Sequence, residues 1–265
     1  QESTSNTTEK APSAQMDLFA MAIDDAPPTP SFQTLEDIKT DYILVNSVEE
    51  REQLLEQLLQ QKSVCFDTET TGLNPLTADL IGLSFCFEKN KAYYMHVPEG
   101  KENEIAQEFK AFFEHPEIEK IAQNLKYDYK VMVKYGIHVS LPYFDTMLAH
   151  YLLEPDQRHN MDILAQNYLN YSPISIETLI GKKGKNQLSM RQAPLEKVYP
   201  YACEDADITF QLKNIFQKEL EGSESLKILN DIEHPLIPVL SKMELEGIKI
   251  DTIALADFSK ELEDR

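Results

Sequence analysis

The chain has 265 residues, 42% of them hydrophobic, and a formal net charge of −20 at pH 7. This length and hydrophobic content are sufficient for one large folded domain with attached segments. Its three widely spaced cysteines, Cys65, Cys86 and Cys203, match neither a disulfide framework nor a zinc motif. No apolar run is long enough to cross a bilayer, and the first residues lack the pattern of a secretory signal. We therefore expect free thiols, a cytoplasmic location and no membrane partner.

The negative charge is unevenly distributed along the chain. Between Lys120 and Pro200, ten basic residues outnumber seven acidic ones, although the whole chain is acidic. Proteins that bind nucleic acid usually present basic surface to the phosphates. The local excess of positive charge leaves two interpretations open, a mixed solvated surface or a phosphate-binding face.

Residues 1–38 have the composition of a disordered linker, rich in Ser, Thr, Pro, Ala and Gln and without sustained periodicity. Within them, Gln15, Leu18 and Phe19 belong to a Gln-Met-Asp-Leu-Phe segment. This segment resembles the short peptide by which bacterial replication proteins dock on the sliding clamp. So short a match also arises by chance, and both interpretations stay open.

The folded part is predicted to begin with a strand at 42–45 and a helix after it. Ser47 and Glu50 have the spacing of a capping box, and leucines continue from there at helical spacing. Strands are also predicted at 79–87 and 92–97, joined by a hairpin connection. Together with the strand at 64–70, these two runs indicate an antiparallel meander.

The strand at 64–70 carries two carboxylates at alternate positions, Asp67 and Glu69. Because successive side chains of a strand point to opposite faces, both acids project from one face. Converging carboxylates beside a core are most simply compensated by a divalent cation. Taken alone, such a pair more often marks a strand end that faces water, so the metal site needs support from the rest of the chain.

Two further acids follow on predicted helices. A helix is predicted at 104–115, and a strand follows at 118–122. The next helix has Asn124 as its expected N-cap and carries Asp128. After a strand and helix at 144–153, short helices are expected at 160–181.

A basic loop follows at 181–185, and Pro200 is expected to begin a long helix. On that helix Tyr201 and Asp205 stand one turn apart. Strands that precede helices in this way indicate an α/β fold with a mixed sheet.

Three short motifs now stand in order along the chain: Asp67-x-Glu69, Asn124-x-x-x-Asp128 and Tyr201-x-x-x-Asp205. Together they resemble the exonuclease motifs of the DEDD nucleases, tyrosine subtype, in the DnaQ-like superfamily. The blocks at 66–70, 123–128, 144–146, 184–188 and 201–207 are similar to the 3′-5′ proofreading exonuclease domain of bacterial DNA polymerase I, of family A. One Asp-x-Glu is a weak signal, whereas three motifs with these intervening blocks are highly specific.

The resemblance implies a ribonuclease H-like fold and two divalent cations, Mg²⁺ physiologically with Mn²⁺ able to substitute. Such a pair of ions supplies an activated water and charge neutralisation for phosphodiester hydrolysis. The implied metal ligands are Asp67, Glu69, Asp128 and Asp205, with Asp67 touching both ions. Tyr201 is implied to orient the attacking water, because a tyrosine with an ordinary pKa near 10 is a poor base at pH 7.

The resemblance also implies a site for the single-stranded 3′ end of DNA. The residues around it would be Leu73, Gln123, Asn124, Tyr127 and Arg158. Wedging by Leu73 and stacking by Tyr127 would tolerate any base sequence. Ile176 departs from the pattern, since some members have a base-stacking phenylalanine there, so its contact would be weaker and purely apolar.

We therefore expect a linker at 1–38, a 3′-5′ exonuclease domain at 39–221 and the truncated start of a polymerase domain at 222–265. The parent would be a DNA-directed DNA polymerase of DNA replication and repair, with its polymerase domain as partner, working at the nucleoid. An RNA-trimming exonuclease of the ribonuclease D kind and a catalytically inactive structural domain are the alternatives. The block at 184–188 argues against the first, and the intact motif acids argue against the second.

Overall fold

The computed structural model describes residues 32–265. Most of the expected linker, including Gln15, Leu18 and Phe19, lies outside the described residues. The last part of it takes part in the fold: Gln33 forms a parallel bridge with Tyr171, and a 3-10 turn, η1, spans Leu35–Asp37. In the described part of the chain, no helix is both long and apolar enough to cross a membrane.

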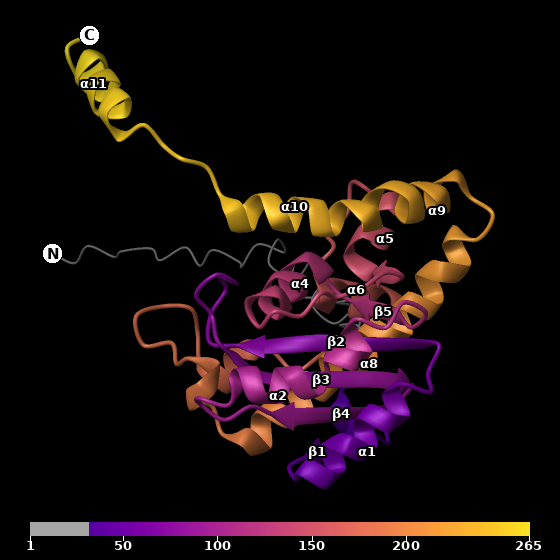
Figure 1. Cartoon of the computed structure of the whole chain (residues 1–265). Coiled ribbons are helices and arrows are strands. Elements are labelled where there is room, and N and C mark those ends of the chain that lie inside the picture. Colours follow the sequence, from indigo (N-terminus) through magenta and orange to yellow (C-terminus); the bar gives the residue numbers. More distant parts are fainter. Residues whose placement is uncertain (1–31) are drawn as a thin grey trace, which may run out of the picture. The chain divides into compact units, whose positions relative to one another are not determined.

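A mixed sheet of six strands, in the order β1-β4-β3-β2-β5-β6, forms the centre of the domain (Figure 1). Strands β2, β3 and β4 pair antiparallel, while β1 is parallel to β4, and β5 is parallel to both β2 and β6. The predicted meander and the predicted mixed α/β sheet are therefore confirmed. The strands are β1 (Asp41–Val45), β2 (Ser63–Thr70), β3 (Leu80–Glu88), β4 (Lys91–His96), β5 (Glu119–Ala122) and β6 (Tyr143–Asp145).

Helices cover both faces of the sheet, and each face has its own apolar cluster. One cluster joins Phe66 and Phe85 to side chains of α1, α2, α3 and α4, and the other joins Cys65 and Ile121 to the buried face of α8. The bounds are α1 (Val48–Leu58), α2 (Glu102–Glu108), α3 (Lys110–Phe113), α4 (Leu125–Lys134), α5 (Thr146–Leu153), α6 (Met161–Leu169), α7 (Ile176–Ile180), η2 (Met190–Gln192) and α8 (Leu195–Leu220). All three cysteines are buried free thiols, as expected.

Two predicted helices differ from the structure. The helix expected at 104–115 is divided into α2 and α3 at Phe109, whose backbone leaves helical geometry and whose ring is buried against Phe85, with centroids 5.3 Å apart. The expected start at Pro200 is wrong, because α8 is one helix that passes through this proline. A proline this near the start deprives only the carbonyl of Glu196 of its helical donor, so the helix continues.

Four elements follow the long helix α8. They are α9 (Glu224–Ile228), the π-helical turn η3 (Leu229–Glu233), α10 (His234–Glu246) and α11 (Thr252–Glu263). Of these, α10 packs against α4 and buries Ile237 in the apolar cluster on that face of the sheet. The segment after the predicted exonuclease domain therefore contributes to the same core.

Candidate active site

Strand β2 distributes its side chains between two helices. Cys65 belongs to the apolar cluster on the α8 side, and Phe66 belongs to the cluster on the α4 side. Because faces alternate along a strand, Asp67 and Glu69 lie on the α8 side and Thr68 lies on the α4 side. One strand therefore presents acids to one helix and a hydroxyl to the other.

Asp205 of α8 meets the two acids of β2. One carboxylate oxygen each from Asp67, Glu69 and Asp205 can be chosen so that all three lie within 4.8 Å of one another. Tyr201 stands one turn before Asp205, and burial and the charge of Asp205 raise the pKa of its hydroxyl. The strand and the helix, far apart in the sequence, thus form one acidic cluster of the type that holds a metal ion.

These carboxylates are electrostatically strained without a counter-charge. Burial raises the pKa of Asp67 to about 7. Burial first, and then the charge of neighbouring carboxylates, raises the pKa of Glu69 and of Asp205 well above the ordinary range. Since desolvation and mutual repulsion both disfavour the charged forms, the cluster favours binding of either protons or a cation.

Two oxygens of the cluster lack a hydrogen-bond donor among residues 32–265. Oε1 of Glu69 and Oδ1 of Asp205 are buried and accept no hydrogen bond from the described residues. Buried polar atoms are nearly always paired, so an unpaired oxygen calls for an explanation. An all-oxygen set of this kind suits a hard divalent cation. The residues present therefore fit a metal ion.

Asp128 lies on α4, on the other side of β2. Its side chain is 2% exposed, and its Oδ1 accepts hydrogen bonds from the backbone N–H of Thr68 at 3.1 Å and from the Thr68 hydroxyl at 2.5 Å. Burial and then the charge of Asp67 raise the pKa of Asp128. Thr68 was missed in the sequence, although its position between the two motif acids required it to face the opposite helix.

The start of α4 is capped differently from the prediction. Asn124 occupies the N-cap position in a left-handed conformation, with φ 62° and ψ 48°, and its side chain makes no capping bond. The carboxylate of Asp145, at the end of β6, accepts instead from the backbone N–H groups of Asn124 at 3.3 Å and Leu125 at 2.8 Å. It also caps α5 by accepting from Met147 and Leu148. Asp145 thus fixes the helix that carries Asp128.

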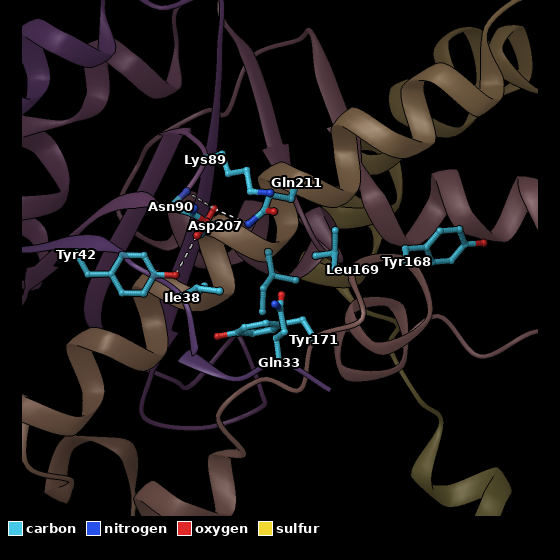
Figure 2. Close-up of a pocket in the computed structure, with 11 residues that line it drawn as sticks. Gln33, Ile38, Tyr42, Lys89, Asn90, Tyr168, Leu169, Tyr171, Asp207 and Gln211 are labelled. Carbon is cyan, nitrogen blue, oxygen red and sulfur yellow. Dashed lines mark hydrogen bonds between the residues drawn. The ribbon is translucent and has the colours of Figure 1, made fainter. Parts of the chain in front are cut away.

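Other acids of α8 serve the fold. Asp207 lines a separate cavity, where the Tyr42 hydroxyl, the Asn90 backbone N–H and the Gln211 amide all donate to its carboxylate (Figure 2). Glu204 is likewise satisfied, since the Tyr171 hydroxyl and the Ile174 N–H donate to it. The contrast with Asp205 separates a candidate ligand from the structural acids beside it in the sequence.

The acidic cluster opens into a cavity of about 460 Å³. All five predicted catalytic residues line it, as do Leu73, Gln123, Asn124 and Tyr127, whereas Arg158 is exposed and does not. Ile176, Lys183 and Gln187 line it as well. Its volume lies within the range of roughly 300–1,000 Å³ that small-molecule sites occupy.

Tyr127 holds the turn at the rim of this cavity. Its hydroxyl donates to the carbonyl of Gly72 at 2.7 Å and lies 2.5 Å from Oγ1 of Thr70. Leu73, which follows Gly72 in the chain, is 92% exposed. The Tyr127 side chain therefore fixes the backbone that presents Leu73 to the cavity.

Comparison with known proteins gives a consistent result. The model of a protein family described as 3′-5′ exonuclease matches residues 42–221. The chain is 36% identical to DNA polymerase I of Borreliella burgdorferi over 92% of its length and 27% of the relative's. It is 37% identical to DNA polymerase I of Pseudomonas aeruginosa over 78% of its length and 24% of the relative's. The chain therefore spans about a quarter of the length of these curated relatives.

Solved structures share the fold. The polymerase domain of Pol1 from M. smegmatis, in complex with DNA primer-template and dNTP, aligns with a TM-score of 0.67 at 19% identity over 83% of this chain and 35% of that one. Escherichia coli RNase D aligns with a TM-score of 0.62 at 15% identity over 77% of this chain and 51% of that one. Brucella melitensis NrnC with bound Mg²⁺ aligns with a TM-score of 0.60 at 18% identity over 81% and 99%.

Proposed function

The chain belongs to the family of 3′-5′ exonucleases, and from this premise we propose that it removes nucleotides one at a time from the 3′ end of single-stranded or frayed DNA. The observation that carries the proposal is a pair of buried oxygens, on Glu69 and Asp205 beside Asp67, that accept no hydrogen bond from residues 32–265 and lie at a cavity of about 460 Å³. Donor-free carboxylates in a cavity suit metal-assisted hydrolysis better than a structural role.

The metal set we propose uses four acids. Asp67, Glu69 and Asp205 would hold one divalent ion, and Asp67 with Asp128 would hold a second, with Mg²⁺ as the physiological ion and Mn²⁺ able to replace it. When bound, the ions supply an activated water and neutralise charge on the attacking and leaving oxygens. Thr68 supports this set because its two hydrogen bonds orient Asp128.

Tyr201 orients the attacking water in this proposal. Burial and Asp205 raise the pKa of the hydroxyl, so it stays protonated at neutral pH. A protonated hydroxyl can both donate to and accept from a water, but it is not a base. Its role is positioning, one turn of α8 away from Asp205.

The substrate strand follows the cavity that the acids share with Leu73 and Tyr127. Leu73, 92% exposed, would enter between bases, and Gln123 and Asn124 offer amides to the sugar and phosphate. Lys183 also lines this cavity and adds a positive charge to it. Arg158 lies outside the cavity and would contact the phosphates near the 3′ end of the strand from there.

The organisation of the parent protein is also a proposal. It comprises a linker at 1–38, an exonuclease domain at 39–221 and the beginning of a polymerase domain at 222–265. Support comes from curated DNA polymerase I relatives, of which the chain covers about a quarter. The parent would be a DNA-directed DNA polymerase in the bacterial cytoplasm, acting at the nucleoid, and Gln15, Leu18 and Phe19 would dock on the sliding clamp.

The test offers the chain single-stranded DNA and RNA of matched sequence, each labelled at the 3′ end, with Mg²⁺ or Mn²⁺. We expect mononucleotide release from DNA, and loss of that release in Asp67→Ala and Asp205→Ala. Faster release from RNA would favour ribonucleic acid as the substrate, in keeping with the fold shared with RNase D. No release from either polymer with either ion would contradict the proposal. A peptide of residues 14–20 that fails to bind a bacterial sliding clamp at high micromolar concentration would remove the docking role.

A further inference from the structure

Helix α10 follows the range that the family model matches, yet it contacts the helix that carries Asp128. The matched range ends at residue 221, and α10 begins at His234. In Figure 1 it runs beside α4, and two polar connections join it to this region. One connection ends on α4 itself, and the other ends on Asp145, which caps α4.

The first connection is made by Glu244, near the end of α10. Its Oε1 accepts from Nζ of Lys126 at 2.6 Å, and its Oε2 accepts from Nζ of Lys130. Lys126 and Lys130 stand one turn apart on one face of α4, and Asp128, midway between them in the sequence, points about 200° away from both. Helix α4 is therefore held on one side by α10 and on the other by Thr68 of β2, which binds Asp128.

The second connection is made by His234, at the start of α10. The imidazole is 2% exposed, and its Nε2 accepts from the backbone N–H of Asp145 at 3.2 Å. Burial lowers the pKa of His234 to about 4, so the ring is neutral at pH 7. The carboxylate of the same Asp145 accepts from the N–H groups of Asn124 and Leu125, the first turn of α4. His234 thus fixes the residue that caps the helix of Asp128.

We propose that α10 is a brace for Asp128 and that His234 and Glu244 are positioning residues for the exonuclease reaction. The inference rests on the proposed function, because Asp128 matters here as a metal ligand. The catalytic unit then extends to Glu246 and is not complete at residue 221. Any change in the polypeptide after α10 that moves this helix is transmitted to the site.

A displacement of α10 should affect the two proposed metal ions unequally. Asp67 and Glu69 lie on β2 and Asp205 lies on α8, whereas Asp128 lies on α4. Loosening α10 should therefore weaken the ion bound between Asp67 and Asp128 and leave the other ion nearly unaffected. A general loss of stability would weaken both.

The experiment uses the whole chain and two pairs of variants. Glu244→Lys reverses the charge that meets Lys126 and Lys130, and Glu246→Lys makes the same charge change on an exposed residue of the same helix. His234→Leu removes the imidazole acceptor, while His234→Gln retains a hydrogen-bond acceptor near the position of Nε2. Mn²⁺ binding is followed by calorimetry, and hydrogen exchange is followed at the amides of Leu125 to Asp128.

For Glu244→Lys and His234→Leu we expect about tenfold weaker binding of one Mn²⁺. The other Mn²⁺ should keep its affinity to within about a factor of two. Exchange at the start of α4 should become faster in both variants. Glu246→Lys and His234→Gln should resemble the unaltered chain.

Two results would overturn the brace: unchanged Mn²⁺ binding and exchange in both variants, or equal weakening of both ions together with a lowered Tm. If the unaltered chain binds no Mn²⁺, the proposed function fails. The brace is still tested in that case, because the exchange of the α4 amides is measured without metal.

Discussion

Thr68 binds Asp128 through two hydrogen bonds, one from its backbone N–H and one from its hydroxyl, both to Oδ1. Because Thr68 stands between Asp67 and Glu69 in β2, one strand fixes three of the four acids of the site. Two of them are its own side chains, and the third is held across the sheet. This contact joins the α8 side of the site to the α4 side.

Replacing Thr68 by valine should impair the site without changing its shape. Val keeps the β-branched volume but leaves Asp128 with only the backbone donor. We expect the Mg²⁺ concentration for half-maximal exonuclease activity to rise by roughly 10–100-fold, as for other residues that orient metal ligands. The measurement is the rate of mononucleotide release against Mg²⁺ concentration. Thr68→Ser keeps the hydroxyl and should stay close to the unaltered chain, and a valine variant with unchanged Mg²⁺ dependence would refute this role.

The buried acids predict an unusual pH dependence of stability for the metal-free protein. Burial raises the pKa of Asp67 from 3.8 to about 7, so between these values the folded state binds more protons than the unfolded chain. The free energy of unfolding in EDTA should therefore decrease as the pH rises through this range. Glu69, Asp128 and Asp205 act in the same direction, because burial raises their pKa values too.

Divalent metal should reverse this trend, because its ligands must lose their protons to bind. The increase in Tm on adding Mg²⁺ should grow as the pH rises from about 5 to 8. Thermal unfolding across this range, with Mg²⁺ or EDTA, provides the measurement. In Asp205→Ala the increase should be largely lost. An increase that is independent of pH would show that these carboxylates do not bind the metal.

Removing the Tyr127 hydroxyl should weaken substrate binding more than turnover. In Tyr127→Phe the turn that presents Leu73 loses the bond to the Gly72 carbonyl. Since one hydrogen bond contributes about 0.5–1.5 kcal/mol, we expect KM for single-stranded DNA to rise about 3–10-fold with kcat nearly unchanged. Tyr129→Phe, on the same helix as Tyr127, loses a contact to His138 and is the matched control. A fall in kcat at constant KM would argue for a direct role in the chemistry instead.

Gly82 leaves the space that Tyr94 fills beside Glu69. Gly82 pairs with Glu69 between β3 and β2, and a Cβ at Gly82 would lie 2.1 Å from the Tyr94 hydroxyl oxygen. The Tyr94 ring is fully buried, so Gly82→Ala should lower the free energy of unfolding by about 1–3 kcal/mol. Urea denaturation measures the loss. Gly184→Ala, where nothing lies within 4 Å, should change it by less than about 0.5 kcal/mol, and equal stabilities of the two variants would contradict this packing.

Local patterns along the sequence were sufficient for most of the fold. Alternation predicted β2 and the common face of Asp67 and Glu69, and the spacing of Ser47 and Glu50 predicted a capping box that the structure contains. The prediction failed at Pro200, where α8 continues. The long buried face of this helix outweighs one lost backbone hydrogen bond, and burial of that face is decided by tertiary packing.

Contacts between distant segments are what the sequence did not reveal. Asn124 was placed correctly at the N-cap of α4, but Asp145, from the next strand, supplies the capping oxygen. Nothing local to Asn124 indicates this. The connections from His234 and Glu244 to this helix span still larger separations and depend on how α10 packs. Motif spacing therefore identifies candidate acids, while the groups that orient them emerge only from the folded structure.

We infer that the acids of β2, α4 and α8 act together in the removal of nucleotides from a 3′ end. The most direct test is a time course with a 5′-labelled oligodeoxynucleotide and Mg²⁺, comparing the unaltered chain with Asp205→Asn. We predict a ladder that shortens one nucleotide at a time from the 3′ end, and no ladder with Asp205→Asn, which keeps the shape of the side chain but removes its charge. Shortening that survives this substitution, or internal cleavage without a ladder, would show that these acids do not form the exonuclease site.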